Sequence, residues 1–536
     1  MGTRKIAWLS LILAVGVVLA GCGGTSTPAG TTVTNPQAAN PAGSWLYPNG
    51  DPENTRDAAG ATISSANVAG LQQAWTFKLP LSLVTSGPGF GSLAATPIVA
   101  NGVVYLQDLG DNVYALALAT GKLRWEYQVS PKIVEGGPNG VALADGVVYG
   151  DTTSTVFALS AATGKPIWVD QDLLGNGQGT FGIQPLVANG RVYLASSIGT
   201  VPTGGILLAL NASTGKLVWT YNTIAPASNG GAETPYGSGG AWETPLAGSD
   251  GSVTFGTGNA YQSAAEAIAH PSPWLYTDSE VNLDAATGKL RWYYQGVTND
   301  FMDHDMQTSP IAATINGQPA VIGSGKMGVV YAMNASTGQL IWKTPVGEHS
   351  ESDSYPLEAM EHQLTLTAPY TILPGSLGGV LSNLALAGNT VYVATVNQRF
   401  TLAKMSYPLG AQDGNGNGNG NGNGNGNGNG NGNGNGNGEI VALNLTTGKV
   451  EWDTTVPTYP LGAATVSDDL VFTTLYTGVL VALDRITGAI VYQRKLPTSA
   501  NAPIAIAGNS ILVPAGGPNV FGPKGGSPQL VAYTVP

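Results

Sequence analysis

The sequence has 536 residues, of which only 10% are charged, and it contains 76 glycines and 11 tryptophans. That composition is typical of a turn-rich β protein and excludes a disordered chain, which would lack enough large apolar side chains. The net charge of −12 argues against a partner bound through a nucleic-acid backbone, because phosphates are held by clustered lysine and arginine.

The first residues have the pattern of a bacterial lipoprotein signal. Arg4 and Lys5 precede an apolar run, and a Leu-Ala-Gly sequence that resembles a lipobox stands directly before Cys22. We therefore expect residues 1–21 to be a signal peptide, Cys22 to carry the lipid, and residues 22–44 to be a flexible tether to the cell envelope. An ordinary signal peptide with a chance cysteine is the alternative. Because Cys22 is the only cysteine, the sequence excludes intrachain disulfides, cysteine-based zinc sites and c-type haem attachment.

One motif recurs along the rest of the sequence. Its clearest copy is ILLALNASTGKLVW at residues 206–219, and near copies lie at 113–125, 156–168, 281–292, 330–342, 440–452 and, ending in Tyr, 480–492. A motif repeated at this period indicates a repeat architecture.

The motif predicts a strand, a tight turn and a returning antiparallel strand. Asn211 has a short side chain that can bond the backbone two residues on, and Gly215 supplies the positive φ that closes the turn. Trp219 then places a large flat ring where one small sheet can meet the next.

The two ends of the chain each carry half of the motif. Residues 68–77 have its second half and residues 526–533 its first half, so the N-terminal strand is expected to complete the last blade. Seven whole motifs and one split motif predict an all-β, eight-bladed β-propeller over residues 45–536. A solenoid or a set of separate β domains is the alternative.

Two stretches between motifs are longer than one blade requires. We interpret residues 220–280 as functional, and the Asn-Gly tract at 414–438 as a disordered surface insertion, because it offers nothing apolar to bury. His349 and His362 lie among glutamates in the second stretch and could bind a metal, although such a polar loop is more often solvated.

The mature chain resembles the eight-bladed quinoprotein alcohol dehydrogenases, which bind pyrroloquinoline quinone (PQQ) and a metal ion on the propeller axis. The resemblance rests on the lead-in Asn54-Thr-Arg and on later segments at 63–75, 95–99, 139–143, 242–259, 300–305, 326–331, 374–379, 461–462 and 470–472. The repeated motif alone is less specific, because it also resembles outer-membrane assembly lipoproteins that carry no cofactor.

The resemblance implies two residues that contact the quinone. Trp242 matches the indole that stacks under the quinone ring, and Lys326 matches the cation that bonds a quinone oxygen. The alternatives are another tryptophan between blades and a plain surface lysine.

The resemblance also implies a site for calcium or a lanthanide ion. Asn259 matches an amide ligand, Asp303 matches the catalytic base beside the metal, and Asp305 matches the extra carboxylate of lanthanide-using members. The alternatives are a turn asparagine and solvated loop acids, which would include Asp300. Met302 stands where the family usually has tryptophan.

Several expected cofactor contacts are replaced. Ile133 and Val134 stand where the family has a cysteine pair, and Asn139 stands where it has the arginine that holds a cofactor carboxylate. The family's metal-binding glutamate corresponds to a position near Thr200. Ala94 replaces a second acidic contact, and Val380 replaces an asparagine. The catalytic half of the site is thus retained, whereas much of the half that holds the cofactor is not.

Three functions follow from this pattern. The first is an extracytoplasmic PQQ-dependent dehydrogenase that oxidises an alcohol-type substrate by hydride transfer and passes electrons to a separate acceptor. The second is a non-catalytic lipoprotein scaffold that binds another envelope protein. The third is an enzyme or sensor with a different small ligand on the axis.

Overall fold

The computed structural model describes residues 43–79, 92–129, 137–171, 173–174, 179–198, 204–224, 239–260, 274–298, 300, 303–350, 370–375, 377–402, 436–517 and 526–536, all within the larger compact unit Asn35–Pro536. The signal peptide, Cys22, nearly all of the tether and all but the last residues of the Asn-Gly tract lie outside these ranges. No helix of sufficient length and hydropathy to cross a membrane occurs in the described part of the chain.

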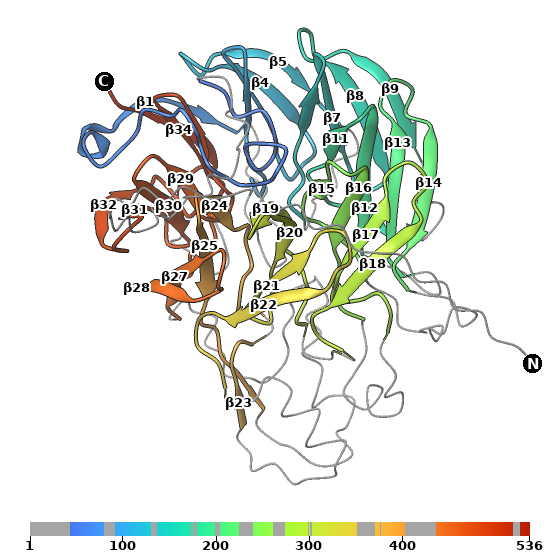
Figure 1. Cartoon of the computed structure of the whole chain (residues 1–536). Coiled ribbons are helices and arrows are strands. Elements are labelled where there is room, and N and C mark those ends of the chain that lie inside the picture. The colour runs from blue at the N-terminus through green and yellow to red at the C-terminus, as the bar shows by residue number, and fades with distance from the viewer. Residues whose placement is uncertain are drawn as a thin grey trace, which may run out of the picture. The chain divides into compact units, whose positions relative to one another are not determined.

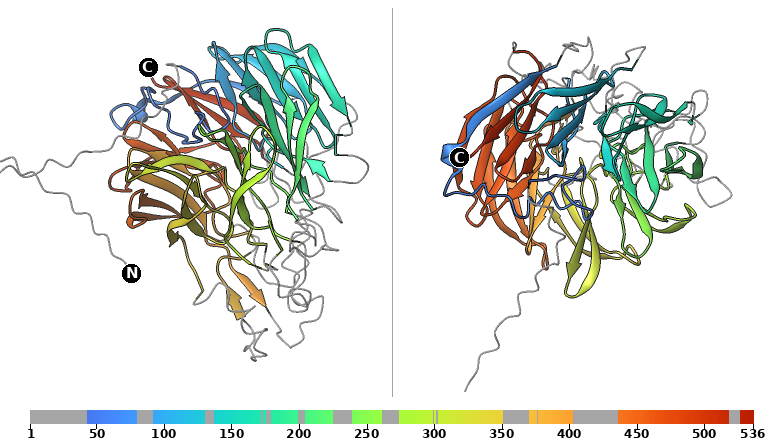
Figure 2. Two further views of the ribbon diagram at one scale, coloured as in Figure 1. Left: turned by 45° about the vertical axis from the view of Figure 1, so that its right-hand side comes forward. Right: turned by 90° about the horizontal axis from the view of Figure 1, so that it is seen from above.

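Eight antiparallel sheets follow one another along the chain and surround a common centre (Figures 1 and 2). Blade one contains β2 (Ile98–Ala100), β3 (Val103–Gln107), β4 (Val113–Ala117) and β5 (Leu123–Tyr127), and blade two contains β6 (Ala142–Ala144), β7 (Val147–Asp151), β8 (Thr155–Ser160) and β9 (Pro166–Gln171). Blade three contains β10 (Thr180–Phe181), β11 (Leu186–Ala188), β12 (Arg191–Ile198), β13 (Ile206–Asn211) and β14 (Leu217–Asn222). Blade four contains β15 (Leu246–Ala247), β16 (Ser252–Gly256), β17 (Ser279–Asp284) and β18 (Leu290–Gln295).

The remaining four blades complete the ring. Blade five contains β19 (Ile311–Ile315), β20 (Gln318–Gly323), β21 (Val329–Asn334) and β22 (Leu340–Pro345), and blade six contains β24 (Ala385–Ala387), β25 (Thr390–Val396), β27 (Gly438–Asn444) and β28 (Val450–Val456). Blade seven contains β29 (Thr465–Ser467), β30 (Leu470–Leu475), β31 (Val479–Asp484) and β32 (Ile490–Lys495). Blade eight contains β33 (Ala505–Ala507), β34 (Ser510–Ala515), β35 (Gln529–Thr534) and β1 (Gln72–Lys78). A two-stranded sheet, β23 (Tyr370–Ile372) with β26 (Phe400–Leu402), and a 3-10 turn, η1 (Val68–Gly70), lie outside the blades.

The ring closes as the split motif predicts. Strand β1 pairs antiparallel with β35, with Gln72 opposite Thr534 and Trp75 opposite Ala532, so the two ends of the chain share one blade. The innermost strand of that blade, β33, also contacts β2 of the first blade. The eight-bladed, all-β prediction is confirmed, and a solenoid with open ends is excluded.

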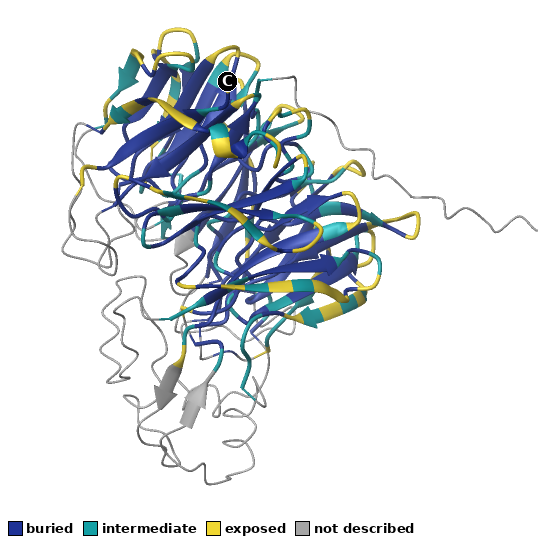
Figure 3. Ribbon diagram, turned by 90° about the vertical axis from the view of Figure 1, so that its left-hand side faces the viewer, coloured by how far each residue is buried: buried dark blue, intermediate teal, exposed yellow. Residues whose placement is uncertain are grey.

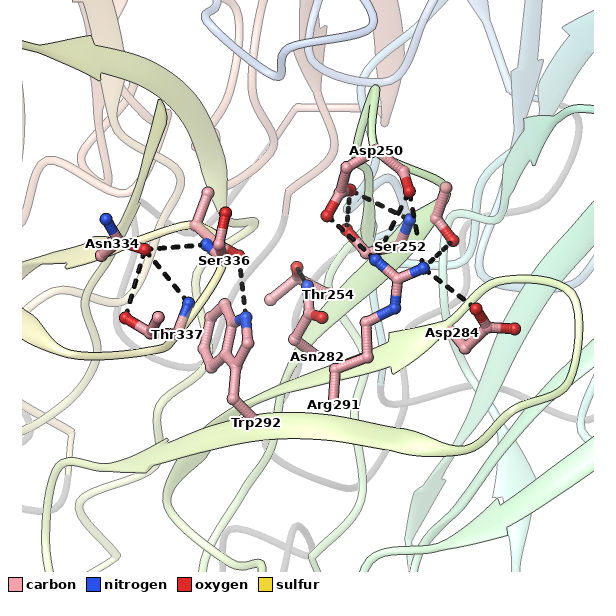
Figure 4. Close-up of polar contacts among 12 residues, drawn as sticks. Asp250, Ser252, Thr254, Asn282, Asp284, Arg291, Trp292, Asn334, Ser336 and Thr337 are labelled. Carbon is pink, nitrogen blue, oxygen red and sulfur yellow. Dashed lines mark hydrogen bonds and ion pairs between the residues drawn. The ribbon is translucent and has the colours of Figure 1, made fainter. Parts of the chain in front are cut away.

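The repeated motif holds each blade to the next. In blade five, Asn334 Oδ1 accepts hydrogen bonds from the backbone N–H groups of Ser336 and Thr337, which shapes the turn, and Trp292 Nε1 of blade four donates to Ala335 O at 2.8 Å (Figure 4). Seven such bonds, 2.6–3.1 Å long, join Trp75 to Leu118, Trp125 to Ala161, Trp168 to Ala212, Trp219 to Ala285, Trp292 to Ala335, Trp342 to Leu445 and Trp452 to Arg485.

The lead-in, residues 43–63, ties together blades that are far apart in sequence. Trp45 exchanges backbone hydrogen bonds with Val99, and further backbone bonds run to Ala312, Leu386 and Val466. Since these partners belong to blades one, five, six and seven, the lead-in crosses the axis.

The apolar core lies mainly in the inner strands (Figure 3), and some of these, such as β2 and β30, are buried along their whole length. The outermost strands instead alternate partly buried and exposed residues, as in β22 and β32. This leaves the loops at the axis as the place where polar side chains from different blades can meet.

Candidate active site

Two acidic side chains from the connection between blades four and five contact one lysine of blade five. Lys326 Nζ lies 2.8 Å from Asp303 Oδ2 and 2.5 Å from Asp305 Oδ2. The side chains of Lys326, Asp303 and Asp305 are 12%, 7% and 1% exposed. They are therefore neither solvated loop acids nor a surface lysine.

The local backbone brings this trio together. Asp303 and Asp305 lie in the connection from β18 to β19, and Lys326 lies in the turn between β20 and β21. Lys326 N donates to Asp305 O at 2.9 Å, which joins the turn to the connection. Asp303 takes a left-handed backbone conformation with φ of 66°, which is uncommon for a residue other than glycine.

Asn259 and Trp242 adjoin Asp305. The backbone N–H of Asn259 donates to Asp305 Oδ1 at 2.8 Å, and Asn259 is 1% exposed. A Cβ added to Gly258 would lie 2.8 Å from both Asp305 Oδ1 and Trp242 Cη2, so the absence of a side chain lets them approach. Trp242 is not one of the seven tryptophans that join blades. All five predicted site residues thus share one region, while their chemical roles stay predictions.

The charges in this region are strongly coupled. Burial raises the pKa of Asp303, and Asp305 raises it further, because one ammonium cannot neutralise two carboxylates; Lys326 opposes both effects. Burial alone would lower the pKa of Lys326, but the two carboxylates raise it above its usual value. Lys326 therefore stays protonated at physiological pH. Burial, then Asp300 and Asp305, raise the pKa of Asp278 in the same region.

The available donors are suited to a hard cation. Asp303 and Asp305 supply carboxylate oxygens and Asn259 can supply an amide oxygen, and such ligands are preferred by calcium-like ions. Within the described residues, no group of three or more His, Cys, Asp or Glu side chains is arranged to hold a metal ion. A metal at this position would therefore depend on the mixed set of two carboxylates and one amide. His349 bonds the carbonyl oxygens of Gly328 and Val346 instead, and His362 lies outside the described residues.

A cavity of about 50 Å³ opens between the blades, and residues from seven of the eight blades line it. The polar part of its lining consists mainly of amides, from Gln184, Asn383 and Asn501, and of hydroxyls, such as those of Thr96 and Thr244. Glu243 supplies the single carboxyl of the described lining. Trp242 does not line this cavity, although the next residue, Glu243, does. The sequence interpretation missed Glu243. Its position directly after Trp242, in a chain with few charged residues, could have drawn attention to it.

Three of the replaced family positions lie in or next to the lining of this cavity. Ala94 is part of the lining. Asn139 is fully buried and its Nδ2 donates to Asp111 Oδ1 at 3.2 Å. Val380 is fully buried and its backbone N–H donates to Gly325 O. Residues 133–134 and Thr200 lie outside the described residues. The described lining thus contains no lysine or arginine.

Two family models match different parts of the chain. Residues 45–375 match the family described as glucose/ethanol/alcohol dehydrogenase, beta-propeller domain, and residues 433–532 match the outer membrane protein assembly factor BamB. The dehydrogenase subunit of the quinone-type alcohol dehydrogenase of Gluconobacter oxydans is 26% identical over 406 residues, which are 65% of this chain and 52% of that protein. The chain therefore spans about half the length of the curated relatives it matches.

Two solved structures share the fold. The quinohemoprotein alcohol dehydrogenase from Comamonas testosteroni has a TM-score of 0.74 at 20% identity, covering 92% of this chain and 80% of that one. A europium-containing methanol dehydrogenase has a TM-score of 0.74 at 19% identity, covering 92% and 98%. At these identities the likeness establishes the propeller and not the chemistry.

Proposed function

The chain belongs to the glucose/ethanol/alcohol dehydrogenase β-propeller family, and we propose on this premise that it oxidises an alcohol-type substrate with PQQ and a metal ion. Hydride transfer to the quinone is the proposed reaction. The observation that supports it most is the buried contact of Lys326 with Asp303 and Asp305. The matched region covers only about half of the curated relatives, so activity, substrate and partners are all part of this proposal.

The residues present fit a metal ion. Asp303, Asp305 and Asn259 would hold it, because all three can offer hard oxygen donors. Lys326 now lies between the two carboxylates, which shows that this position favours positive charge. The missing side chain of Gly258 keeps the approach to Asp305 open.

The residues also fit the reactive part of a quinone. Trp242, packed over Gly258 beside Asp305, would offer its indole face, and Lys326 would donate a hydrogen bond to a quinone oxygen. When bound, PQQ would supply the acceptor for two electrons and the metal would supply Lewis acidity.

The chain's own contribution is to move a proton and to stabilise charge. Asp303 is the more exposed of the two carboxylates, at 7% against 1% for Asp305, so Asp303 would accept the proton of the substrate hydroxyl on its Oδ atoms. Lys326, which bonds Asp303 Oδ2, would orient the base and favour its ionised form. Asp305 would remain a ligand.

The setting of this reaction is also proposed. Cys22 would carry the lipid that anchors the protein outside the cytoplasmic membrane, and a separate acceptor would take the electrons. The experiment uses purified protein mixed with PQQ and either calcium or lanthanum, and measures alcohol-dependent dye reduction. We expect activity in the wild type and its loss in Asp303→Asn. Absence of activity with a range of alcohols and both metals would overturn the proposal.

A second function has its own support. The described cavity lining lacks a basic side chain, and residues 433–532 match an assembly factor. Both features favour a scaffold that binds an envelope protein. Such a scaffold would retain a stable partner in a pull-down with Asp303→Ala, whereas it would give no dye reduction.

A further inference from the structure

The axial cavity is small, and its described lining is almost entirely neutral. Its volume of about 50 Å³ gives room for about three to five water molecules, since one water needs roughly 10–15 Å³. A small ion with one or two waters fits such a space, whereas an organic cofactor does not. Any resident of this cavity must therefore be water or a small ion.

The single carboxyl of the described lining belongs to Glu243. This residue directly precedes Thr244 and β15 of blade four, and it is partly exposed to the cavity while protein surrounds it elsewhere. Asn383 Nδ2 donates to Glu243 Oε2 at 2.9 Å. Asn383 is itself held in place, because its Nδ2 also contacts Asn49 Oδ1 at 3.1 Å and its Oδ1 accepts from the backbone N–H of Ser309 at 2.8 Å. The carboxyl thus has a fixed position beside the cavity.

The guanidinium of Arg56, which acts on Glu243, is already fully engaged. Arg56 is fully buried, and its donors go to Ala464 O, Asn49 Oδ1, Thr96 Oγ1, Thr465 Oγ1 and Ile504 O. A guanidinium has five N–H donors, so none remains to bond Glu243.

Two carboxylates act on this one guanidinium. Burial lowers the pKa of Arg56 to about 9, and the carboxylates of Glu243 and Asp51 oppose this effect. Asp51 is only 1% exposed. Burial in turn raises the pKa of Glu243 to about 7, while Asn383 and Arg56 act in the opposite direction. The groups present therefore do not offset the burial of the Glu243 carboxylate, and one further positive charge would do so.

Two other side chains of the lining can supply oxygen ligands. Asn501, in the connection from β32 to β33, is half-buried, and its amide makes no hydrogen bond with the described residues. Ser382 is 8% exposed, and within the described ranges its buried hydroxyl also has no hydrogen-bond partner. A buried hydroxyl without a partner costs free energy, so a ligand that it can coordinate is favoured there. Glu243, Asn501 and Ser382 precede the inner strands of blades four, eight and six, so one bound ion would join three blades.

We propose that the axial cavity binds one monovalent cation, potassium or sodium, through oxygens of Glu243, Asn501 and Ser382. Hard cations prefer such oxygen ligands, and a singly charged ion balances one carboxylate. A divalent ion would leave an excess positive charge buried near Arg56, which is costly. This site is separate from the metal site proposed at Asp303, and it does not depend on a quinone.

The test measures urea unfolding at pH 8 in potassium chloride or sodium chloride, with N-methylglucamine chloride as the reference salt at equal ionic strength. N-methylglucamine is too large for the cavity, so it reproduces the screening by salt without the binding. A ligand that binds only the folded protein raises the unfolding free energy with its concentration, and this dependence gives the Kd. We expect potassium or sodium to stabilise the wild type in this way. The NMR signal of thallous ion, which resembles potassium in size and charge, measures binding directly.

Variants of the lining show whether the ion lies in the cavity. Glu243→Gln should raise the Kd by about 100-fold or more, because the ion loses its charged ligand. Ser382→Ala removes one neutral ligand and should raise the Kd by about three- to tenfold. Glu280→Gln is the matched control, because Glu280 is a fully buried carboxyl that does not line the cavity, and it should keep the wild-type Kd. The double variant Asp303→Asn/Asp305→Asn should keep it too, which excludes binding at that site.

Two results would overturn the proposal. The first is a wild type that potassium and sodium stabilise no more than N-methylglucamine does, since the cavity then holds only water. The second is a wild-type Kd in Glu243→Gln. If circular dichroism shows that Glu243→Gln does not fold, Ser382→Ala decides, and an unchanged thallous-ion Kd in that variant also overturns the proposal. Because PQQ is absent throughout, none of these results bears on the dehydrogenase proposal.

Discussion

Gly288 of blade four lies directly against the indole of Trp219 in blade three. A Cβ added at Gly288 would lie 2.6 Å from Trp219 Cδ2. Gly288 also has φ of 69°, so it both closes the motif's turn and makes room for the ring. The same pairing recurs at six of the seven other junctions of the ring, between Gly121 and Trp75, Gly164 and Trp125, Gly215 and Trp168, Gly338 and Trp292, Gly448 and Trp342, and Gly488 and Trp452.

Gly288→Ala should destabilise the propeller through two separable effects. The left-handed backbone costs a non-glycine residue about 1–3 kcal/mol, and the clash with Trp219 adds to this. Gly251→Ala is the matched control, since Gly251 has φ of 77° but its Cβ would meet nothing nearer than 3.9 Å. Urea unfolding should show a larger loss for Gly288→Ala; equal losses would mean that the packing against Trp219 is unimportant.

Arg56→Met should destabilise the ring strongly. It would remove the five donors that Arg56 supplies to buried acceptors, and removing one partner from a buried charged network costs about 3–5 kcal/mol. Arg399→Met is the control, because the Arg399 side chain is 66% exposed and its ion pair with Glu348 should contribute less than about 1 kcal/mol. Similar unfolding free energies for the two variants would contradict this role of Arg56.

Glu280 should make the protein less stable as the pH rises. It is fully buried in β17, and burial raises its pKa well above the ordinary value. The folded protein therefore holds a proton that the unfolded chain releases above about pH 4.5, so stability falls from there up to the folded-state pKa. Denaturant unfolding at pH 5 and pH 8 should show this loss reduced in Glu280→Gln but unchanged in a variant of the partly exposed Glu348. If Glu280→Gln lost as much unfolding free energy between pH 5 and pH 8 as the wild type, groups other than Glu280 would control the pH dependence of stability.

Lys326→Met should reduce turnover. Removing one preorganised donor that stabilises developing negative charge costs about 10²–10³ in kcat. Lys326→Arg keeps the charge and should recover part of the rate. Dye reduction at saturating PQQ and metal measures the effect. Full activity of Lys326→Met would remove this lysine from the proposed mechanism.

The sequence was sufficient to predict the ring and its closure, because the repeated motif carries the information locally. Asn211 shapes its own turn, and Trp219 reaches only to Ala285 and Gly288 in the next blade. Tyr492 replaces the tryptophan in the last whole motif. The split blade explains this replacement, because its two outer strands, β35 and β1, are not joined by a turn that a tryptophan could bond. There, Arg494 donates to Leu71 O at 2.7 Å instead.

The cavity wall could not be predicted in the same way. Gln184, Glu243 and Asn383 belong to blades three, four and six, and each lies in a connection with no repeating pattern. Their proximity arises only when the ring is closed. The buried state of Asp303 and Lys326 was likewise not decidable from the sequence, since a loop acid and a lone lysine are usually solvated.

The central claim is that Asp303, Asp305 and Asn259 form a metal site beside Trp242. Terbium luminescence, excited through tryptophan, tests it most directly, because the emission reports binding and proximity to the indole together. We expect saturable emission from the wild type, a strong loss in the double variant Asp303→Asn/Asp305→Asn, and dimmer emission at retained affinity in Trp242→Phe. Emission from the double variant that equals that of the wild type, or no saturable emission from the wild type, would contradict the account.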